Sequence, residues 1–456
     1  MGEWPANGSY AMSHASEWRV GGSVDVTGQL PGFIRRFLAL EQRHLWRPER
    51  WRNVTDDEQL CRRYLPESCA AFRLPCFWVQ RKYLYVYGGR DEGAALGLAE
   101  EFGPDSRVLF LVHPAELPRY AEFLAHVRAR DGTDTGVSLC ATPTSSTRTV
   151  LAWRDGCPNT AFFAKLSLRC GSLGDRRIQR RRAARSVGLS ALVQQLGHGM
   201  PPAVAWFPET LAMVPRLMPE GGLIIRSIPM EMKEGSVVPA PLFSLMGGSG
   251  SDPPLLLQML GQDAELARSV VTEVLLAKFA GIWVDLVFGM GLMLEAHGQD
   301  LLLALSKDMV PCGGFYYRDF EGLTVDWGLR RARGLSEGPS LPHSCDWYET
   351  YETLGYPLHQ LVSWKIRTSL FDYICLVLAE LDLAAVEWRT RGLMPSGEKW
   401  EGELTMLFSR HLRKAIRERY GMREDREYDI HRDLSRFVKF LMRVRSEVLQ
   451  SKGSSR

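Results

Sequence analysis

The stretch LMLEAHGQDLLLAL, residues 292–305, places the polar group Glu295–Asp300 between two apolar runs. It ends a long apolar segment with helical spacing and begins an apolar strand. The apolar runs indicate a buried region, where a polar side chain without a partner is costly. If the group is extended, Glu295, His297 and Gln299 share one face, because side chains alternate along a strand. We therefore predict a ligand-binding face here; the alternative is a polar strand edge in solvent.

Strands are predicted in the middle of the chain, and helices mainly at its end. The predicted strands lie at residues 77–89, 107–114, 162–170 and 223–230, with a pair in 295–323 joined by a Pro-Cys-Gly-Gly turn. Helical spacing is found at residues 33–51, 115–129, 255–290 and from 348 onward. Regular alternation of strand and helix is missing, so the sequence predicts an α+β protein rather than a doubly wound sheet.

The composition is that of a globular protein large enough for two or three domains. The chain has 456 residues, 45% of them hydrophobic, and a net charge of +3. A charge so close to zero does not favour binding to nucleic acid or to an anionic membrane. Nine cysteines, an odd number without a CxxC pair, indicate free thiols in a reducing compartment.

Neither a signal peptide nor a membrane span is predicted. Residues 1–18 lack the apolar run of a signal peptide. Leu275–Leu294 is apolar, but Lys278 and Asp285 lie within it, and each would cost about 2.5–3.5 kcal/mol at the centre of a bilayer. We predict a buried core helix at this place and a cytoplasmic protein that needs no membrane.

Two loops could complete a phosphate site. A hairpin that contains YYRDFEG, residues 316–322, would bring Asp319 next to Glu295, and two carboxylates could hold a Mg²⁺ that bridges nucleotide phosphates. The alternative for the RD pair is a surface salt bridge. In SSTRTV, residues 145–150, hydroxyl groups and Arg148 could bind phosphate, unless the segment is only a polar loop.

Basic residues provide two further candidates. Lys165 lies within the apolar strand FFAKLSL, where its amine must reach either solvent or an anion. The arginine-rich run 175–185 could contact phosphates, although a solvated face is the usual role of such a run. Walker A, dinucleotide-binding glycine, HExxH and GxSxG motifs are absent from the sequence.

Taken in order, five short motifs resemble the NRPS-independent siderophore synthetases, the family of the aerobactin synthetases (IucA/IucC-like). They are a His-Pro segment at His113–Pro114, SxRT at Ser146–Thr149, KLSL at Lys165–Leu168, EAHGQ at Glu295–Gln299 and RD at Arg318–Asp319. The resemblance covers roughly residues 105–325. Each motif alone is weak, and their shared order makes the resemblance specific.

The resemblance implies a hand-like fold and an ATP-dependent ligase. Residues 1–100 would form a shortened, thumb-like N-terminal region, 101–250 the fingers with the ATP site, and 251–456 a largely helical palm. A small carboxylic acid, citrate or another polycarboxylate, would attack the α-phosphorus of ATP to give an acyl-adenylate and pyrophosphate. An amine or hydroxyl co-substrate would then take the acyl group and release AMP, as in siderophore biosynthesis. Family members are often dimers, so a homodimer is compatible with the resemblance.

The resemblance also implies roles for individual residues. Phosphates of ATP would be bound by Ser146, Arg148, Thr149, Lys165, His297, Gln299, Asp300 and Asp319. Glu295 and Asp319 would hold Mg²⁺. His297, Arg148 and Lys165 would act in catalysis, with His297 donating to the α-phosphate or to the acid. Arg177 would bind the remaining carboxylates of the acid, and Lys399 is the candidate for the substrate-binding lysine of the C-terminal part.

Several positions depart from the family pattern. Asp300 stands where the family has Asn, and Leu173 where it has Thr, while the N-terminal motif with glycine, histidine and lysine is missing. These changes affect the acid side of the site more than the phosphate side, so adenylation is better supported than citrate as the acid. The same changes are also compatible with an alternative function, that of a non-catalytic homologue that binds a nucleotide or a partner synthetase.

Overall fold

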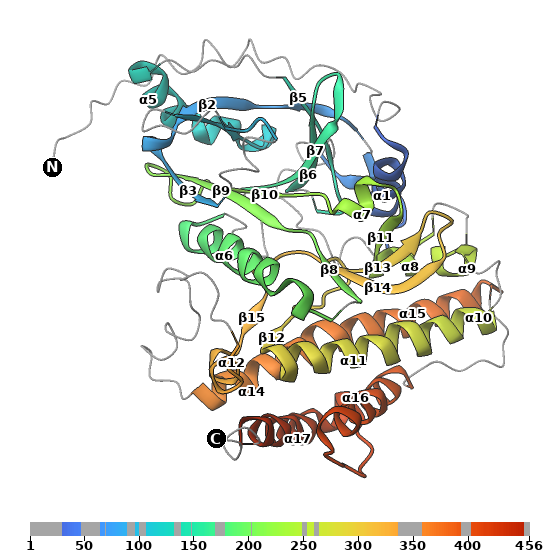
Figure 1. Ribbon diagram of the computed structural model, residues 1–456. Coiled ribbons are helices and arrows are strands. Elements are labelled where there is room, and N and C mark those ends of the chain that lie inside the picture. Colours follow the sequence, from blue (N-terminus) through green and yellow to red (C-terminus); the bar gives the residue numbers. More distant parts are fainter. Residues whose placement is uncertain are drawn as a thin grey trace.

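The computed structural model describes residues 30–46, 64–68, 70–88, 96–99, 106–131, 138–146, 148–168, 178–201, 203–248, 253–259, 264–335, 358–393 and 403–450. In the described part of the chain, strands lie between Phe72 and Val325, and only helices follow Val325 (Figure 1). The α+β class predicted from the sequence is therefore confirmed. Strands from residues 70–88 and from residues 139–226 share one sheet, and the predicted division into three regions stays a prediction.

A seven-stranded antiparallel sheet forms the upper layer in Figure 1. Its strands, in spatial order, are β1 (Phe72–Leu74), β5 (Leu139–Pro143), β6 (Thr149–Arg154), β7 (Cys157–Leu166), β10 (Leu223–Arg226), β9 (Glu209–Pro215) and β3 (Leu84–Gly88). One face packs against α5 (Ala121–Asp131) and the strand pair β2 (Cys76–Gln80) and β4 (Arg107–Leu111), as one apolar cluster that includes Phe110 and Phe123.

The other face of this sheet is covered by two helices that leave polar residues between them. The long helix α6 (Arg180–Leu196) packs Ala183 and Val187 against β9 and β10. Helix α1 (Gly32–Gln42) packs Phe37 against Phe163 of β7. Lys165, two residues further along β7, lies on the same face, because side chains alternate along a strand.

A second, four-stranded sheet lies between the first sheet and the C-terminal helices (Figure 1). Its strands, in spatial order, are β11 (Val237–Pro241), β13 (Leu301–Ser306), β14 (Pro311–Tyr317) and β8 (Val204–Trp206). A short pair, β12 (Leu292–Met293) and β15 (Thr324–Val325), flanks the site that is described below. The remaining short helices are Pro66–Ser68, Arg81–Tyr83, Pro114–Tyr120, Gly197–Gly199, α7 (Met230–Lys233), α8 (Leu242–Met246) and α12 (Trp327–Ala332).

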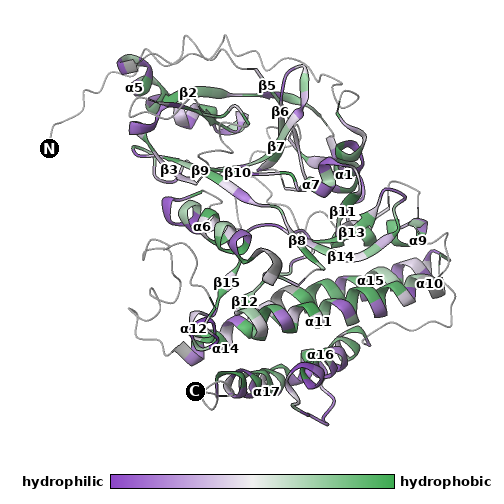
Figure 2. Ribbon diagram, viewed as in Figure 1, coloured by the Kyte–Doolittle hydropathy of each residue, from purple (hydrophilic) through white to green (hydrophobic). Residues whose placement is uncertain are grey.

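Long helices build the lower layer, with their green apolar sides visible in Figure 2. The short helix α9 (Leu255–Met259), which contacts α8, precedes them. They comprise one run of α10 (Ala264–Ser269), a π-helix (Val270–Lys278), α11 (Phe279–Val284) and a second π-helix (Asp285–Met290), a second run of α14 (Leu358–Thr368), a third π-helix (Ser369–Cys375) and α15 (Leu376–Thr390), and the helices α16 (Leu404–Tyr420) and α17 (Ile430–Gln450). Trp283 and Phe288 are fully buried in this layer, which confirms the prediction of a core helix in Leu275–Leu294. None of the helices in the described ranges has both the length and the apolarity for a membrane crossing.

Three local predictions were wrong. Residues 77–89 form two strands, because Arg81–Tyr83 adopt a 3-10 turn between them. The helix predicted at 115–129 begins as a 3-10 helix, since Pro118 lies within Pro114–Tyr120 and lacks a donor for an α-helical hydrogen bond. The Pro-Cys-Gly-Gly segment lies within β14, and residues 307–310 make the turn instead.

The polar group Glu295–Asp300 is a turn and not a strand. The carbonyl oxygen of His297 accepts the N–H groups of both Asp300 and Leu301, at 2.9 Å each. This closes the chain into a tight connection between β12 and β13. The prediction that Glu295, His297 and Gln299 share one strand face is therefore wrong, because alternation applies only to extended backbone.

Candidate functional site

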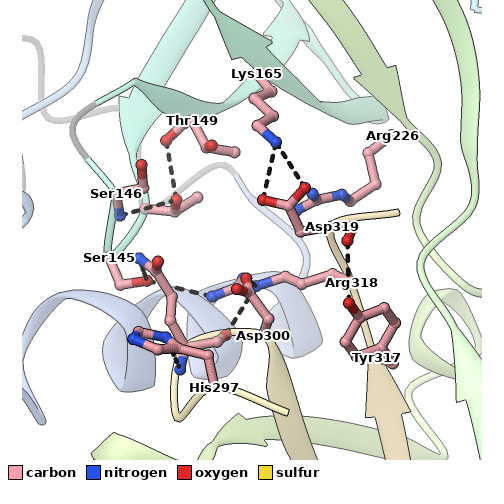
Figure 3. Close-up of polar contacts among 12 residues, drawn as sticks. Ser145, Ser146, Thr149, Lys165, Arg226, His297, Asp300, Tyr317, Arg318 and Asp319 are labelled. Atoms are coloured by element: carbon pink, nitrogen blue, oxygen red, sulfur yellow. Dashed lines mark hydrogen bonds and ion pairs between the residues drawn. The ribbon is translucent and has the colours of Figure 1, made fainter. Parts of the chain in front are cut away.

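The polar side chains gather where the second sheet meets the face of the first sheet that carries Lys165 (Figure 3). Leu301 of β13 pairs with Tyr317 of β14, so the turn before β13 and the loop after β14 lie side by side. The Arg318 N–H donates to the carbonyl of Asp300 at 3.0 Å. These contacts bring the EAHGQ and RD motifs together. Lys165 of KLSL bonds to Asp319 of RD, and Ser145, the residue before SxRT, bonds to Arg318 of RD, so four motifs meet here.

Lys165 is the buried charge at the centre of this cluster. Its side chain is 3% exposed, and its ammonium lies 2.7 and 2.8 Å from the two carboxylate oxygens of Asp319 and 3.3 Å from Glu321. The sequence predicted that the Lys165 amine reaches either solvent or an anion, and in the structure it reaches an anion, Asp319. A buried ammonium needs such partners, because removing an ion from water costs several kcal/mol.

Asp319 is held in a backbone conformation that is unusual for its residue type. Its φ angle is +76°, in the left-handed region that non-glycine residues rarely adopt. The carbonyl of Asp319 accepts hydrogen bonds from the Tyr317 hydroxyl and from the Gly322 N–H, both at 3.1 Å. These contacts fix the turn that aims the Asp319 carboxylate at Lys165, and such strain is typical of functional sites.

The SxRT segment is a tight loop between β5 and β6. The carbonyl of Thr149 accepts from the N–H and the hydroxyl of Thr144 at 3.0 and 2.9 Å, and the Thr149 N–H donates to Ser146. Thr149 also pairs in register with Lys165, so the loop ends beside the lysine. Arg148 is buried, and its carbonyl accepts the N–H of Leu166 at 2.8 Å.

Glu41 of α1 joins this loop to the RD motif, a role that the sequence reasoning missed. Its carboxylate lies 2.8 Å from Arg318 and accepts the N–H of Ser145 at 2.9 Å. The Ser145 hydroxyl in turn accepts from Arg318 and from the amide of Gln299. The signal was present, because Glu41 continues the buried face of Phe37 and Leu40 at helical spacing, where a carboxylate needs a cationic partner.

The two aspartates of the cluster have pKa values shifted in opposite directions. Burial and repulsion by Asp319 raise the pKa of Asp300 to about 7, against the attraction of Arg318, Arg226 and Lys165. Burial also acts to raise the pKa of Asp319, but Lys165, Arg226 and Arg148 outweigh it, and the pKa lies below its ordinary value. Asp319 is thus the ionised partner, and Asp300 carries a proton below neutral pH.

His297 lies partly buried at the start of the turn. Its Nδ1 accepts the backbone N–H of Gln299 at 3.3 Å. An accepting Nδ1 places the proton of the neutral ring on Nε2. The ring therefore has the tautomer that donates from Nε2, as the predicted role of His297 requires.

The carboxylates fit a magnesium ion that is bound mainly by its ligand's phosphates. Asp300 and Asp319 repel each other across the site, and a cation that prefers oxygen ligands would relieve this repulsion. The carboxylate of Glu295 lies against Gly322, three residues after Asp319 in the chain, and the predicted role of Glu295 in holding Mg²⁺ stays a prediction. Among the residues that the structure describes, no three His, Cys, Asp or Glu side chains are grouped to hold a metal ion. Mg²⁺ typically takes one or two protein carboxylates and completes its shell with phosphates and water.

Four residues singled out in the sequence analysis are not part of the described cluster. Arg177, Leu173 and Lys399 are outside the described residues. His113 is 2% exposed, packs edge-on against Tyr64 and accepts the N–H of Ala115. It caps the following 3-10 helix, which is a structural role.

The sequence of the first half matches a known family. Residues 43–203 match the sequence model of the IucA / IucC family. This part of the chain is an IucA/IucC-family segment. It contains the SxRT and KLSL motifs, and the predicted resemblance to the NRPS-independent siderophore synthetases is confirmed. No curated protein sequence matches this chain.

Solved structures share the fold of this chain at low sequence identity. The ATP-bound aerobactin synthetase IucA from a hypervirulent pathotype of Klebsiella pneumoniae is 18% identical, with a TM-score of 0.50 over 74% of this chain and 65% of that one. IucC from the same pathotype is 18% identical, with a TM-score of 0.57 over 80% and 66%. The petrobactin biosynthesis protein AsbB from Bacillus anthracis str. Sterne is 14% identical, with a TM-score of 0.57 over 81% and 65%. The chain thus spans about two thirds of the length of these proteins.

Proposed function

We propose that this chain is an ATP-dependent ligase that adenylates a small carboxylic acid and transfers the acyl group to an amine or hydroxyl. The observation that carries the proposal is the Lys165–Asp319 pair, which lies buried among Arg148, Arg226 and Asp300. This is a largely buried cluster of opposite charges, to which four motifs contribute. The ATP-bound state of a protein with the same fold supports a nucleotide here.

The proposed chemistry requires charge neutralisation around the phosphates. A carboxylate oxygen of the acid bonds to the α-phosphorus of ATP, and the bond to the pyrophosphate oxygen breaks. Lys165, Arg148 and the hydroxyls of Ser146 and Thr149 would bind the phosphates, and His297 would donate its Nε2 proton to an α-phosphate oxygen. Asp319, together with Glu295 or Asp300, would hold Mg²⁺, which would supply positive charge to neutralise the phosphates.

The second half-reaction transfers the acyl group. The amine or hydroxyl attacks the acyl carbon, loses a proton, and AMP leaves with the bonding electrons. Both half-reactions take place beside the same cluster, which holds the substrates in position and so lowers the activation barrier of each step. The family suggests a polycarboxylate such as citrate and a product in siderophore biosynthesis.

A second candidate function is nucleotide binding without catalysis. Lys165 is already paired with Asp319 and Glu321, and Asp300 adds a negative charge near the phosphates. A protein of this kind would bind ATP and contact a partner synthetase without releasing pyrophosphate.

ATP–pyrophosphate exchange distinguishes the two functions. The purified chain with Mg²⁺ and ATP is tested against citrate, 2-oxoglutarate, succinate and amino acids. Exchange that depends on one acid supports the ligase and gives its substrate class. ATP binding without exchange for any acid rejects the ligase in favour of the binding protein.

A further inference from the structure

Arg226 is a buried arginine at the end of β10 that points into the cluster (Figure 3). It is 4% exposed and pairs in register with Phe163, two residues before Lys165. Because side chains alternate along a strand, Arg226 and Lys165 lie on the same face of the first sheet. That face is turned toward Asp319 and the RD loop.

The hydrogen-bonding capacity of Arg226 is only partly used within the chain. Its Nη2 donates to the carboxylate of Glu209 at 2.7 Å. Its buried Nε has no hydrogen-bond partner among the described residues, and one oxygen of Glu209 is in the same situation. A buried donor without a partner costs about 1–3 kcal/mol, and more for a charged group. A bound ligand is one way in which such a donor gains a partner, and Arg226 differs from other buried donors of this kind because it lies beside Asp319.

Arg226 interacts electrostatically with the carboxylates of the site. Glu209, Asp319 and Asp300 all act on its guanidinium, with Glu209 the strongest of the three. Lys165 is paired with Asp319 and Glu321, and Arg318 with Glu41. Arg226 differs from these two cations, because it combines a carboxylate partner with an N–H donor that is left over.

We propose that Arg226 is an oxyanion-binding residue of this site. Its Nε–H donates to a carboxylate of the acid or to a phosphate of the nucleotide, while the bond from Nη2 to Glu209 holds the guanidinium in place. A planar guanidinium can serve two oxygen acceptors at once, which a lysine ammonium does with less directional control. This inference rests on the proposed function and adds a binding residue that lies on a different strand from the four motifs.

Calorimetric binding of citrate and of pyrophosphate to the full chain tests the inference. The test variant is Arg226→Lys, which keeps a positive charge beside Glu209 and removes the Nε donor. The matched control is Arg445→Lys, which weakens another buried pair, with Asp326 at 2.6 Å, outside the site. Thermal unfolding of both variants reports the cost to the fold. If Arg226→Lys does not fold, the double variant Arg226→Met with Glu209→Met replaces the buried pair by apolar side chains, a change that is often neutral for stability.

We expect Arg226→Lys to weaken the binding of one probe at least about tenfold, which equals 1.4 kcal/mol, while Arg445→Lys binds both probes as the wild type does. Weaker citrate binding assigns Arg226 to the acid, and weaker pyrophosphate binding assigns it to the nucleotide. Unchanged binding of both probes, or a wild-type chain that binds neither, overturns the inference.

Exchange activity is measured in parallel. Wild-type exchange with unchanged binding in Arg226→Lys rejects only this inference, and a binding defect without wild-type exchange rejects only the ligase.

Discussion

Replacing Glu41 by alanine tests whether α1 is part of the site or only packs beside it. The Glu41 and Arg318 side chains are 0% and 4% exposed, and their charged atoms lie 2.8 Å apart. Removing one partner of such a buried pair costs about 3–5 kcal/mol, because the other charge stays buried. The Ser145 N–H also loses its acceptor. Since proteins are stable by about 5–15 kcal/mol, Glu41→Ala should lose a large part of the total.

Urea unfolding, followed by tryptophan fluorescence, measures this loss. Arg36→Ala is the control on the same helix, because Arg36 is exposed and, within the described ranges, donates only to the carbonyl of Lys307. Such a surface change should stay within about 0.5 kcal/mol. Glu41→Gln should lie between the two, since the amide oxygen can still accept from Ser145 while the ion pair is lost. A loss below about 1 kcal/mol for Glu41→Ala, or equal losses for Glu41 and Arg36, refutes the reasoning from the buried pair.

Three further predictions concern the cluster itself. The pKa of Asp300 is raised to about 7 from an unfolded value near 3.9, so the folded chain binds more protons than the unfolded chain between these pH values. Its stability should therefore fall as pH rises from about 4 to 7. Urea unfolding of Asp300→Asn should show a weaker fall, and equal slopes for the variant and the wild type would contradict the raised pKa. His297→Ala and Arg148→Ala should each abolish adenylation in the exchange assay while circular dichroism stays that of the wild type, and full activity in either variant would reject the site assignment. Gly322→Ala should destabilise the chain by about 1–3 kcal/mol in urea unfolding, because a Cβ would come within 2.5 Å of the Glu295 carboxylate; a neutral effect would show that Glu295 moves freely.

The sequence predicted the parts of the fold that depend on local pattern. Apolar runs predicted the strands at β4, β7 and β10 and the buried helix before residue 290. The hairpin argument brought the loop after β14 to the turn before β13, since both flank one pair of strands. The burial of Lys165 predicted a contact with either an anion or solvent. The anion is Asp319, which lies 154 positions away in the chain.

The parts that were missed depend on tertiary contacts. Glu41 and Arg318 are 277 positions apart, and local spacing gives no reason to join them. The group Glu295–Asp300 has the composition of a strand edge, yet His297 closes it into a turn through two backbone hydrogen bonds. Arg226 follows an apolar run just as Lys165 does, and the same argument about a buried cation would have marked it.

The fate of an ¹⁸O label tests the central claim most directly. The acid that supports exchange is labelled in its carboxylate and incubated with the chain, ATP, Mg²⁺ and an amine. If the acid is adenylated, the oxygen that bonded to the α-phosphorus stays there, and one ¹⁸O appears in AMP by mass spectrometry. Label in inorganic phosphate together with ADP would show attack at the γ-phosphorus and would contradict the account.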